Sequence, residues 1–190
     1  AAARSQLRDR RLPGAMATLI EALDSPHTML QETARSCLSE FDVLRYLNAY
    51  DGMSEEVRLN TGQLVGKVDT NAVGLLTEEL HSASRGRRLR AIEVAQSLDL
   101  TSALEAPLLD LLADDDHMIR TAAAEALAQC PTEKSRLALR TATLDDSPAV
   151  RSAAERALDE MVVAATERAV VPRHVQSPAN STSEQGGGSW

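Results

Sequence analysis

The sequence predicts an all-α fold, an α-α superhelix (solenoid) of about five stacked antiparallel helix pairs. The main observation is a helix-forming phrase that recurs five times, with its second position at residues 31, 58, 90, 120 and 151. The steps of 27, 32, 30 and 31 residues have the length of one helix pair. A second observation is that apolar residues within each unit recur three and four positions apart, as on one helix face. Each unit can bury that face only against its neighbours.

The repeat domain is predicted to span residues 12–171, with approximate repeats at 12–42, 43–69, 70–100, 101–131 and 132–171. Residues 1–11 contain four arginines and are expected to form a basic N-terminal arm or cap. Residues 172–190 are rich in Ser, Asn, Gln, Gly and Pro and have no apolar periodicity. Such a segment buries too little surface to offset its ordering entropy, so we expect a disordered tail.

The first two repeats differ in regularity. In the first, an apolar helix face over 16–23 is followed by Asp24-Ser25-Pro26, which ends one helix and starts the next. Ser favours the N-cap position, and Pro is tolerated at the first helical position. The second repeat is predicted to have a shortened first helix near 44–50, a break at Asp51-Gly52 and a second helix over about 54–68.

The other three repeats are more regular. The third pairs an apolar helix face over 73–80 with another over 89–98. In the fourth, residues 102–105 fit a capping box, and Pro107 is expected to bend the helix that follows. An acidic turn at 114–116 then leads into a second helix over 119–129. The fifth repeat has its turn at 145–148 and a second helix from residue 150 to 161 that extends toward residue 171.

Residues 114–127, Asp-Asp-Asp-His-Met-Ile-Arg-Thr-Ala-Ala-Ala-Glu-Ala-Leu, resemble a HEAT repeat, and residues 145–158 resemble one equally closely. The resemblance covers about residues 12–161. It implies that second helices line the concave side of a curved array, and that turn aspartates bond with helix arginines to brace successive repeats. The residues expected in this structural ladder are Asp114, Arg120, Asp145, Arg151, Arg58 and Arg90. Most members of the family are protein-binding scaffolds.

The composition bears on function and compartment. The net charge of −8 and the presence of only four aromatic residues argue against non-specific nucleic-acid binding, because such binding depends on phosphate neutralisation by Lys and Arg. Cys37 and Cys130 lie three repeats apart, beyond disulfide reach, which favours free thiols and a reducing, cytoplasmic location. The apolar runs are shorter than the roughly 20 residues of a membrane span.

Two groups of residues are candidates for partner binding. Arg85, Arg87 and Arg88 replace the acidic turn of other repeats at a helix N-terminus, where the helix dipole disfavours cations. They are expected either to dock an acidic segment of a partner or to pair with nearby acids such as Glu78, Glu79 and the 114–116 turn. Tyr46 and Tyr50 lie within the shortened helix of the second repeat. They are expected either to anchor a partner, with Tyr50 the more exposed, or to fill volume that the short helix leaves.

The sequence offers no motif for chemistry. The histidines at 27, 81, 117 and 174 are scattered, without the His-Glu pairs on which HEAT-type deoxyhypusine hydroxylases rely, so no metal or other cofactor is expected. The prediction is therefore a protein–protein interaction scaffold or regulatory module without catalytic activity. Two alternatives stay open: a HEAT-type bilin lyase-like enzyme, and a nucleic-acid-binding HEAT-like protein.

Overall fold

The computed structural model describes the backbone of residues 14–170 and the side chains of residues 14–166. The predicted basic arm (1–11) and disordered tail (172–190) lie outside the described residues. Within the described part, every regular element is a helix, which confirms the all-α prediction.

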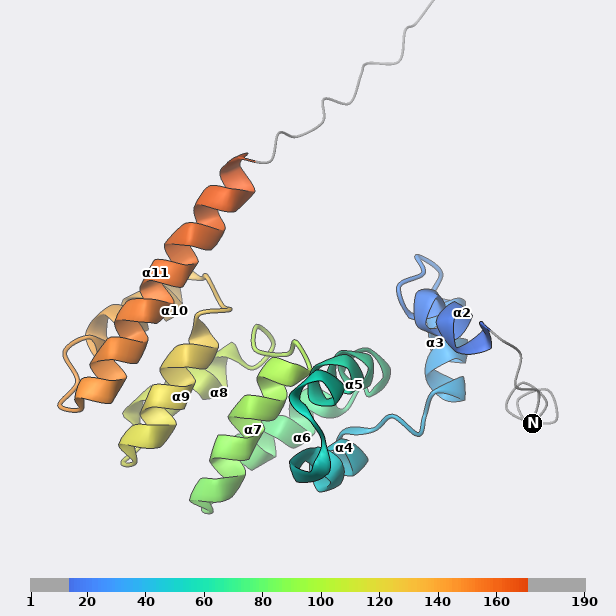
Figure 1. Cartoon of the computed structure of the whole chain (residues 1–190), viewed down its shortest axis with the longest axis horizontal. Coiled ribbons are helices and arrows are strands. Elements are labelled where there is room, and N and C mark those ends of the chain that lie inside the picture. The colour runs from blue at the N-terminus through green and yellow to red at the C-terminus, as the bar shows by residue number, and fades with distance from the viewer. Residues whose placement is uncertain (1–13, 171–190) are drawn as a thin grey trace, which may run out of the picture.

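The helices follow one another as five antiparallel pairs along an elongated, bent array (Figure 1). Short 3-10 turns, η1 (Tyr50–Gly52) and η2 (Leu111–Ala113), continue the first helices of the second and fourth pairs. The pairs are α2 (Ala15–Leu23) with α3 (Thr28–Cys37), α4 (Val43–Ala49) with α5 (Glu55–Val68), α6 (Ala72–Leu80) with α7 (Arg85–Ser97), α8 (Glu105–Asp110) with α9 (His117–Leu127), and α10 (Glu133–Ala142) with α11 (Pro148–Val170). This order agrees with the five predicted repeats.

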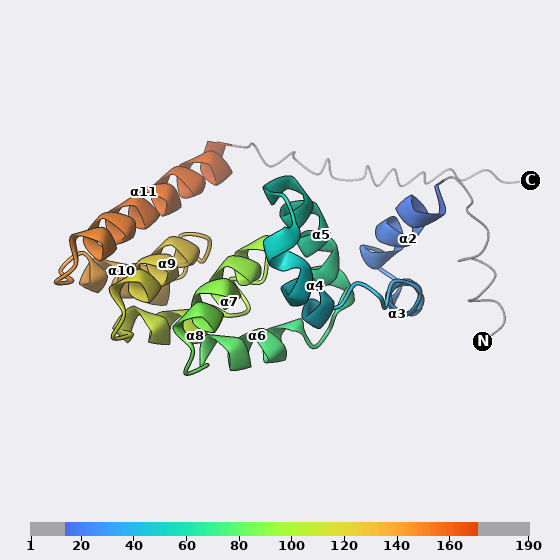
Figure 2. The same cartoon turned by 60° about the horizontal axis from the view of Figure 1, so that its bottom comes forward.

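The second helices of the later pairs pack side by side and form one layer, with the first helices α6, α8 and α10 below it in the view of Figure 2. Helix α9 contacts both α7 and α11, and α5 contacts α7. Small side chains make this packing close: Ala123, Ala124 and Ala126 on α9, and Ala153 and Ala154 on α11, are completely buried. Because alanine adds little thickness, neighbouring helix backbones approach closely along this layer.

The apolar interior has two parts. The main core runs from Val43 to Met161 through the last four pairs. The first pair contributes to a separate, smaller cluster in which Leu23, Ala34, Leu38 and Val68 are buried. Across this junction the ammonium of Lys67 lies 2.7 Å from the Asp24 carboxylate, in an exposed ion pair of the kind that stabilises by at most about 1 kcal/mol. The first pair is therefore joined to the array by little buried surface.

The start of the fourth pair differs from the prediction. Helix α8 begins at Glu105, and residues 101–104 form a turn before it, so the capping box is wrong. The Glu105 carboxylate instead accepts hydrogen bonds from the hydroxyls of Thr132 and Ser135 at the start of α10, the second at 2.6 Å. Pro107 is the third residue of α8, where the backbone N–H has no acceptor within the helix. A proline there removes no helical hydrogen bond, and no bend is needed.

The last second helix differs from its predecessors in one aligned position. Gly62, Ile92 and Ala124 are buried where α5, α7 and α9 meet neighbouring helices. The equivalent residue of α11 is Glu155, which is exposed. A polar outer face of this kind is typical of a terminal, capping repeat.

Candidate functional site

A turn of constant geometry precedes four of the five second helices. Its first residue accepts a hydrogen bond from the N–H two residues later, and its carbonyl accepts one from the side chain six residues later, as in Asx- and ST-turns. The side chains six residues later donate over 2.7 to 2.8 Å: Gln31 to Ser25, Arg88 to Ser82, Arg120 to Asp114 and Arg151 to Asp145. The acceptors of the first bond are Ser25, Ser82, Asp114 and Asp145.

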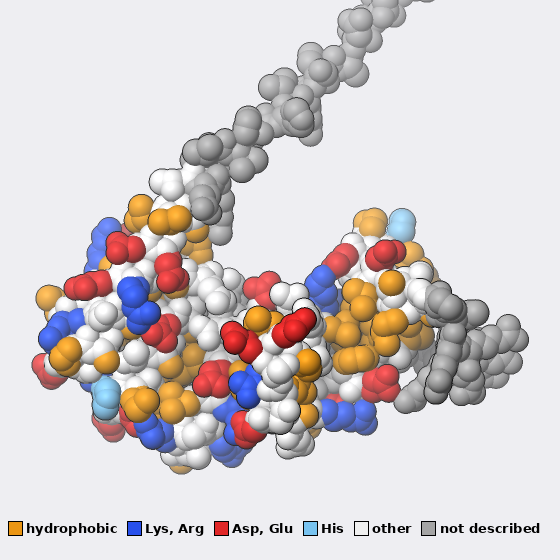
Figure 3. Space-filling view, viewed as in Figure 1, with side chains coloured by type: hydrophobic (Ala, Val, Ile, Leu, Met, Phe, Trp, Pro, Cys, Tyr) orange, Lys and Arg blue, Asp and Glu red, His pale blue; other side chains and the backbone are white. Residues whose placement is uncertain are grey.

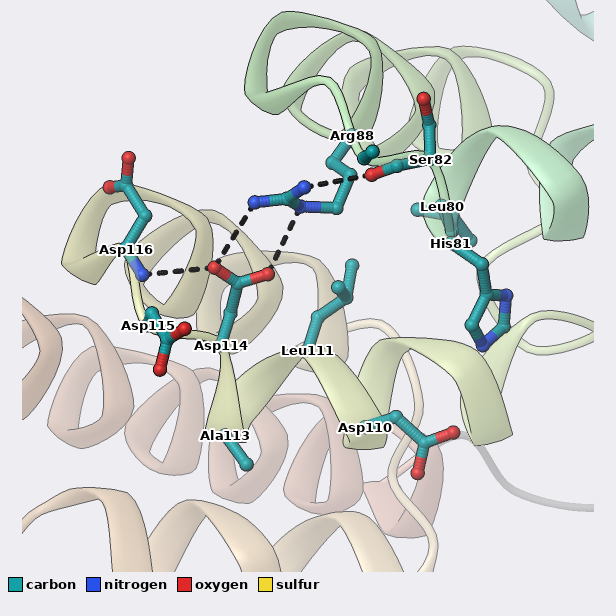
Figure 4. A pocket seen from close by; sticks show the side chains of 11 residues that line it. Leu80, His81, Ser82, Arg88, Asp110, Leu111, Ala113, Asp114, Asp115 and Asp116 are labelled. Carbon is teal, nitrogen blue, oxygen red and sulfur yellow. Dashed lines mark hydrogen bonds and ion pairs between the residues drawn. The ribbon is translucent and has the colours of Figure 1, made fainter.

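Two of these arginines also reach the carboxylate of the following turn, which creates the ladder between repeats. The Nε and Nη2 atoms of Arg120 lie 2.9 and 3.0 Å from the two Asp145 carboxylate oxygens. Arg88 approaches Asp114 with the same two atoms: its Nη2 donates a hydrogen bond over 3.3 Å, and its Nε lies 3.0 Å from the carboxylate as an ion pair without hydrogen-bond geometry (Figure 4). The hydrogen bonds from Arg120 lower the pKa of Asp145, and those to Asp145 raise the pKa of Arg120. Each arginine thus pairs with the aspartate of the next repeat, and Arg151, in the last pair, bonds only with carbonyls of its own turn among the described residues.

The structure corrects one ladder position: Arg88 occupies it instead of Arg90. Four buried residues of α9 lie three, four, six and seven positions after Arg120, and four buried residues of α7 lie at the same distances after Arg88. The repeated Leu-Arg phrase of the sequence predicted Arg90, whereas the pattern of buried residues shows that Arg88 is the residue of α7 equivalent to Arg120. Arg90 instead forms an exposed ion pair with Asp51.

Arg58, also predicted in the ladder, has no acidic partner among the described residues, because Ser82 stands at the turn position of the next repeat. Its Nε donates to the Tyr50 carbonyl at 2.9 Å, and its guanidinium lies 4.2 Å from the centre of the Tyr50 ring. This cation–π contact occupies the place of an ion pair in the irregular second repeat.

The predicted basic docking cluster consists of paired cations. Arg85 forms an ion pair with Asp116, and Arg87 binds Glu79, with its Nε 2.6 Å from a carboxylate oxygen. Hydrogen bonding to Arg87 lowers the pKa of Glu79. Arg88 is mostly buried in the ladder, so its assignment to a partner-binding surface is wrong. Arg85 and Arg87 remain about half exposed, with their charges neutralised locally.

The expectation that Tyr46 and Tyr50 anchor a partner is also wrong. Their exposed fractions are 2% and 5%, and their rings meet edge to face with centroids 5.6 Å apart. The Tyr46 hydroxyl donates to the Arg58 carbonyl at 2.7 Å, and burial raises the pKa of Tyr46. Helix α4 has only seven residues, and the two rings fill the volume between it and α5.

Groups that could perform chemistry are dispersed in the described part of the chain. No three His, Cys, Asp or Glu side chains there are grouped as metal ligands. Burial raises the pKa of the Cys130 thiol, and Cys37 is partly buried. His81 bonds through Nδ1 to the Thr77 carbonyl of its own helix. None of the described helices is long and apolar enough to cross a membrane.

One open hollow lies between the turns of the third and fourth pairs (Figure 4). Its volume is about 480 Å³. Arg88 extends across it toward Asp114, and Ser82 supplies its carbonyl from the opposite side. The polar groups of Arg88, Ser82 and Asp114 in its wall therefore already bond with one another, and the rest of the lining lies within residues 80–83 and 110–116.

A second hollow, of about 320 Å³, lies on the face of the second helices. We call it the second-helix groove. Alanine side chains of α9 and α11 contribute to its lining, together with the amides of two glutamines and a set of charged groups. Its residues are Gln96, Glu125, Ala128, Gln129, Ala153, Arg156, Ala157 and Glu160. Arg156 bonds with Glu125 at 2.8 Å, across the interface between α11 and α9. Sequence reasoning did not identify this groove, because its residues come from three repeats.

Exposed apolar side chains gather over α2 and α3 (Figure 3). Met16 and Leu30 are about half exposed and Met29 is 80% exposed. Leu30 occupies the position at which Ile119 and Val150 are completely buried in later repeats. The first pair therefore leaves open an apolar surface at a position that the last two pairs bury.

Comparison with known families agrees with this architecture. Residues 73–159 match the family model described as HEAT repeats, a range that contains both ladder ion pairs. No curated protein gives a significant match to the chain. The stacked helix pairs, their arginine–aspartate ladder and the match over 73–159 together show that this part of the chain consists of HEAT repeats.

Proposed function

We propose that this chain is a protein–protein interaction module without catalytic activity, and that its partner docks on the second-helix groove. HEAT repeats are commonly used for protein interaction. The groove carries the proposal because it spans α7, α9 and α11, so a partner there contacts three successive repeats. An extended surface of this kind is what stacked repeats build.

The other side chains considered for function are already engaged within the protein or buried, which supports the choice of the groove. The ladder arginines and aspartates bond with one another, the tyrosines are buried, and the Cys130 thiol is disfavoured as a thiolate. The bilin-lyase and nucleic-acid alternatives would need exposed aromatic or basic groups, and no observation on the described residues favours either.

The proposal is tested by blocking the groove. Ala128→Trp places a large ring at the groove wall, and Leu144→Trp places the same ring at a turn residue that is 83% exposed and outside the groove. Immobilised wild-type and variant chains would be compared for the proteins they retain from a cell extract, identified by mass spectrometry. We expect Ala128→Trp to lose partners that Leu144→Trp retains, with similar melting temperatures. Retention of the same proteins by both variants would contradict docking at the groove.

A further inference from the structure

We infer that the partner segment bound at the second-helix groove is basic, with a lysine or arginine side chain seated beside Glu160. This inference rests on the proposed function and names the chemistry of the partner. It is based on a comparison of the paired and the unpaired charged side chains on the face of the second helices.

The cations on the face of the second helices are all engaged among the described residues. Arg156 bonds with Glu125 at 2.8 Å, and Arg90 forms an ion pair with Asp51. Two exposed carboxylates remain: Glu160 in the groove, and Glu93 on α7 at the position equivalent to Glu125. The side-chain carboxylates of Glu93 and Glu160 form no hydrogen bond or ion pair with another described residue, whereas the backbone carbonyl of Glu93 accepts a hydrogen bond from the Ser97 hydroxyl. Within the lining of the groove, Glu125 is paired with Arg156 and Glu160 is left over, so the surplus charge of the groove is negative.

The shape of the groove suits a long basic side chain. Ala128 lines it with a partly exposed methyl group that can contact the methylene stem of a lysine or arginine, and the small buried side chains of Ala153 and Ala157 leave space above them. The amide oxygen of Gln96 can accept a hydrogen bond from an ammonium or guanidinium group, whereas that of Gln129 already accepts one from the Thr101 hydroxyl at 3.0 Å, and Glu160 supplies the opposite charge. The apolar stem of such a side chain would contact alanine, and its charged end would lie beside a carboxylate.

The ion pairs of the arginine cluster on α7 also favour a basic partner segment over an acidic one. An acidic partner segment was expected because Arg85, Arg87 and Arg88 stand together in the sequence. Each of these arginines is paired with Asp116, Glu79 or Asp114, so an acidic ligand would have to displace an existing carboxylate. A basic ligand at the groove meets carboxylates that have no such competitor.

The test uses two synthetic helix-forming peptides of equal length, one of lysine and alanine and one of glutamate and alanine, titrated into the full chain by calorimetry at low ionic strength. We expect the lysine peptide to bind and the glutamate peptide not to bind. Glu160→Gln and Glu93→Gln should each weaken binding by roughly two- to fivefold, the effect of one exposed ion pair. Binding should also fall with added salt.

The matched control is Glu133→Gln, which makes the same charge change at an exposed residue at the start of α10, outside the groove. It should leave the affinity unchanged. Equal weakening by all three substitutions would attribute binding to net charge and would overturn the inference, as would failure of the lysine peptide to bind.

These outcomes are separable from those of the groove-blocking experiment. Loss of cellular partners with Ala128→Trp, together with partners insensitive to Glu160→Gln, would retain the docking site and reject the basic segment. Lysine-peptide binding that is unaffected by Ala128→Trp would reject the groove as its site.

Discussion

The close contact between α5 and the end of α7 gives a prediction that depends on two glycines. A Cβ atom at Gly62 would lie 2.4 Å from the Ser97 carbonyl oxygen, and one at Gly66 would lie 2.3 Å from the Leu98 carbonyl oxygen. Ordinary carbon–oxygen contacts are about 3.3 Å or longer. An alanine at either position would therefore require α5 to move by about 1 Å from the backbone of α7, which cannot yield as a flexible side chain can.

The expected size of the effect combines two terms. Overpacking a well-packed interface costs about 1–3 kcal/mol, whereas replacing glycine by alanine within a helix gains up to about 1 kcal/mol. Gly62→Ala should thus lower the free energy of unfolding by about 0–2 kcal/mol. Gly74→Ala is the control, because Gly74 lies in α6 and a Cβ atom added there would have no neighbouring atom within 4 Å. It should raise the free energy of unfolding by about 0.5–1 kcal/mol.

Urea unfolding followed by circular dichroism at 222 nm measures the free energy of unfolding of both variants. We expect Gly62→Ala to be less stable than Gly74→Ala by about 1–3 kcal/mol. In a thermal melt this corresponds to at least about 2 °C for a chain of this size. If Gly62→Ala proved as stable as Gly74→Ala, the close backbone approach of α5 and α7 would be refuted.

Three further predictions concern the ladder and the array end. Arg88→Ala should destabilise by about 1–3 kcal/mol because it leaves Asp114 without its partner, whereas Arg90→Ala should cost less than about 0.5 kcal/mol; equal losses in urea unfolding would return Arg90 to the ladder. Because hydrogen bonding to Arg120 depresses the folded-state pKa of Asp145, its stabilising contribution is present above the unfolded value of about 3.9 and is lost as pH falls through the lower folded value. The stability difference between wild type and Asp145→Asn, measured in urea, should therefore shrink below about pH 4, and a difference constant with pH would contradict this. Finally, Ala124→Glu should destabilise by about 3–5 kcal/mol by burying an unpaired charge, whereas Glu155→Ala at the equivalent position of α11 should change stability by less than about 0.5 kcal/mol; similar effects in thermal melts would show that α11 does not end the array as a cap.

The order of helices could be predicted from the sequence, because helix propensity and apolar spacing act within a few residues. The shortened helix before Asp51-Gly52 and the start of α5 after Ser54 were expected, and α4, η1 and α5 have those positions. Pro148 is the first residue of α11, so this helix begins two residues before its predicted start at residue 150. The period of about thirty residues required the helices to pair, since a single amphipathic helix cannot bury its own face.

Only the tertiary structure decided which side chains meet across repeats. Arg88 and Arg90 are equally good candidates in a sequence phrase, and burial against neighbouring helices selects Arg88 for the ladder. The tyrosines could be assigned inward or outward, and the space beside α4 buries them. The second-helix groove, the partners of the arginine cluster and the contact at Gly62 all join residues about thirty positions apart. Such contacts depend on helix–helix distances and side-chain volumes, which local periodicity does not contain.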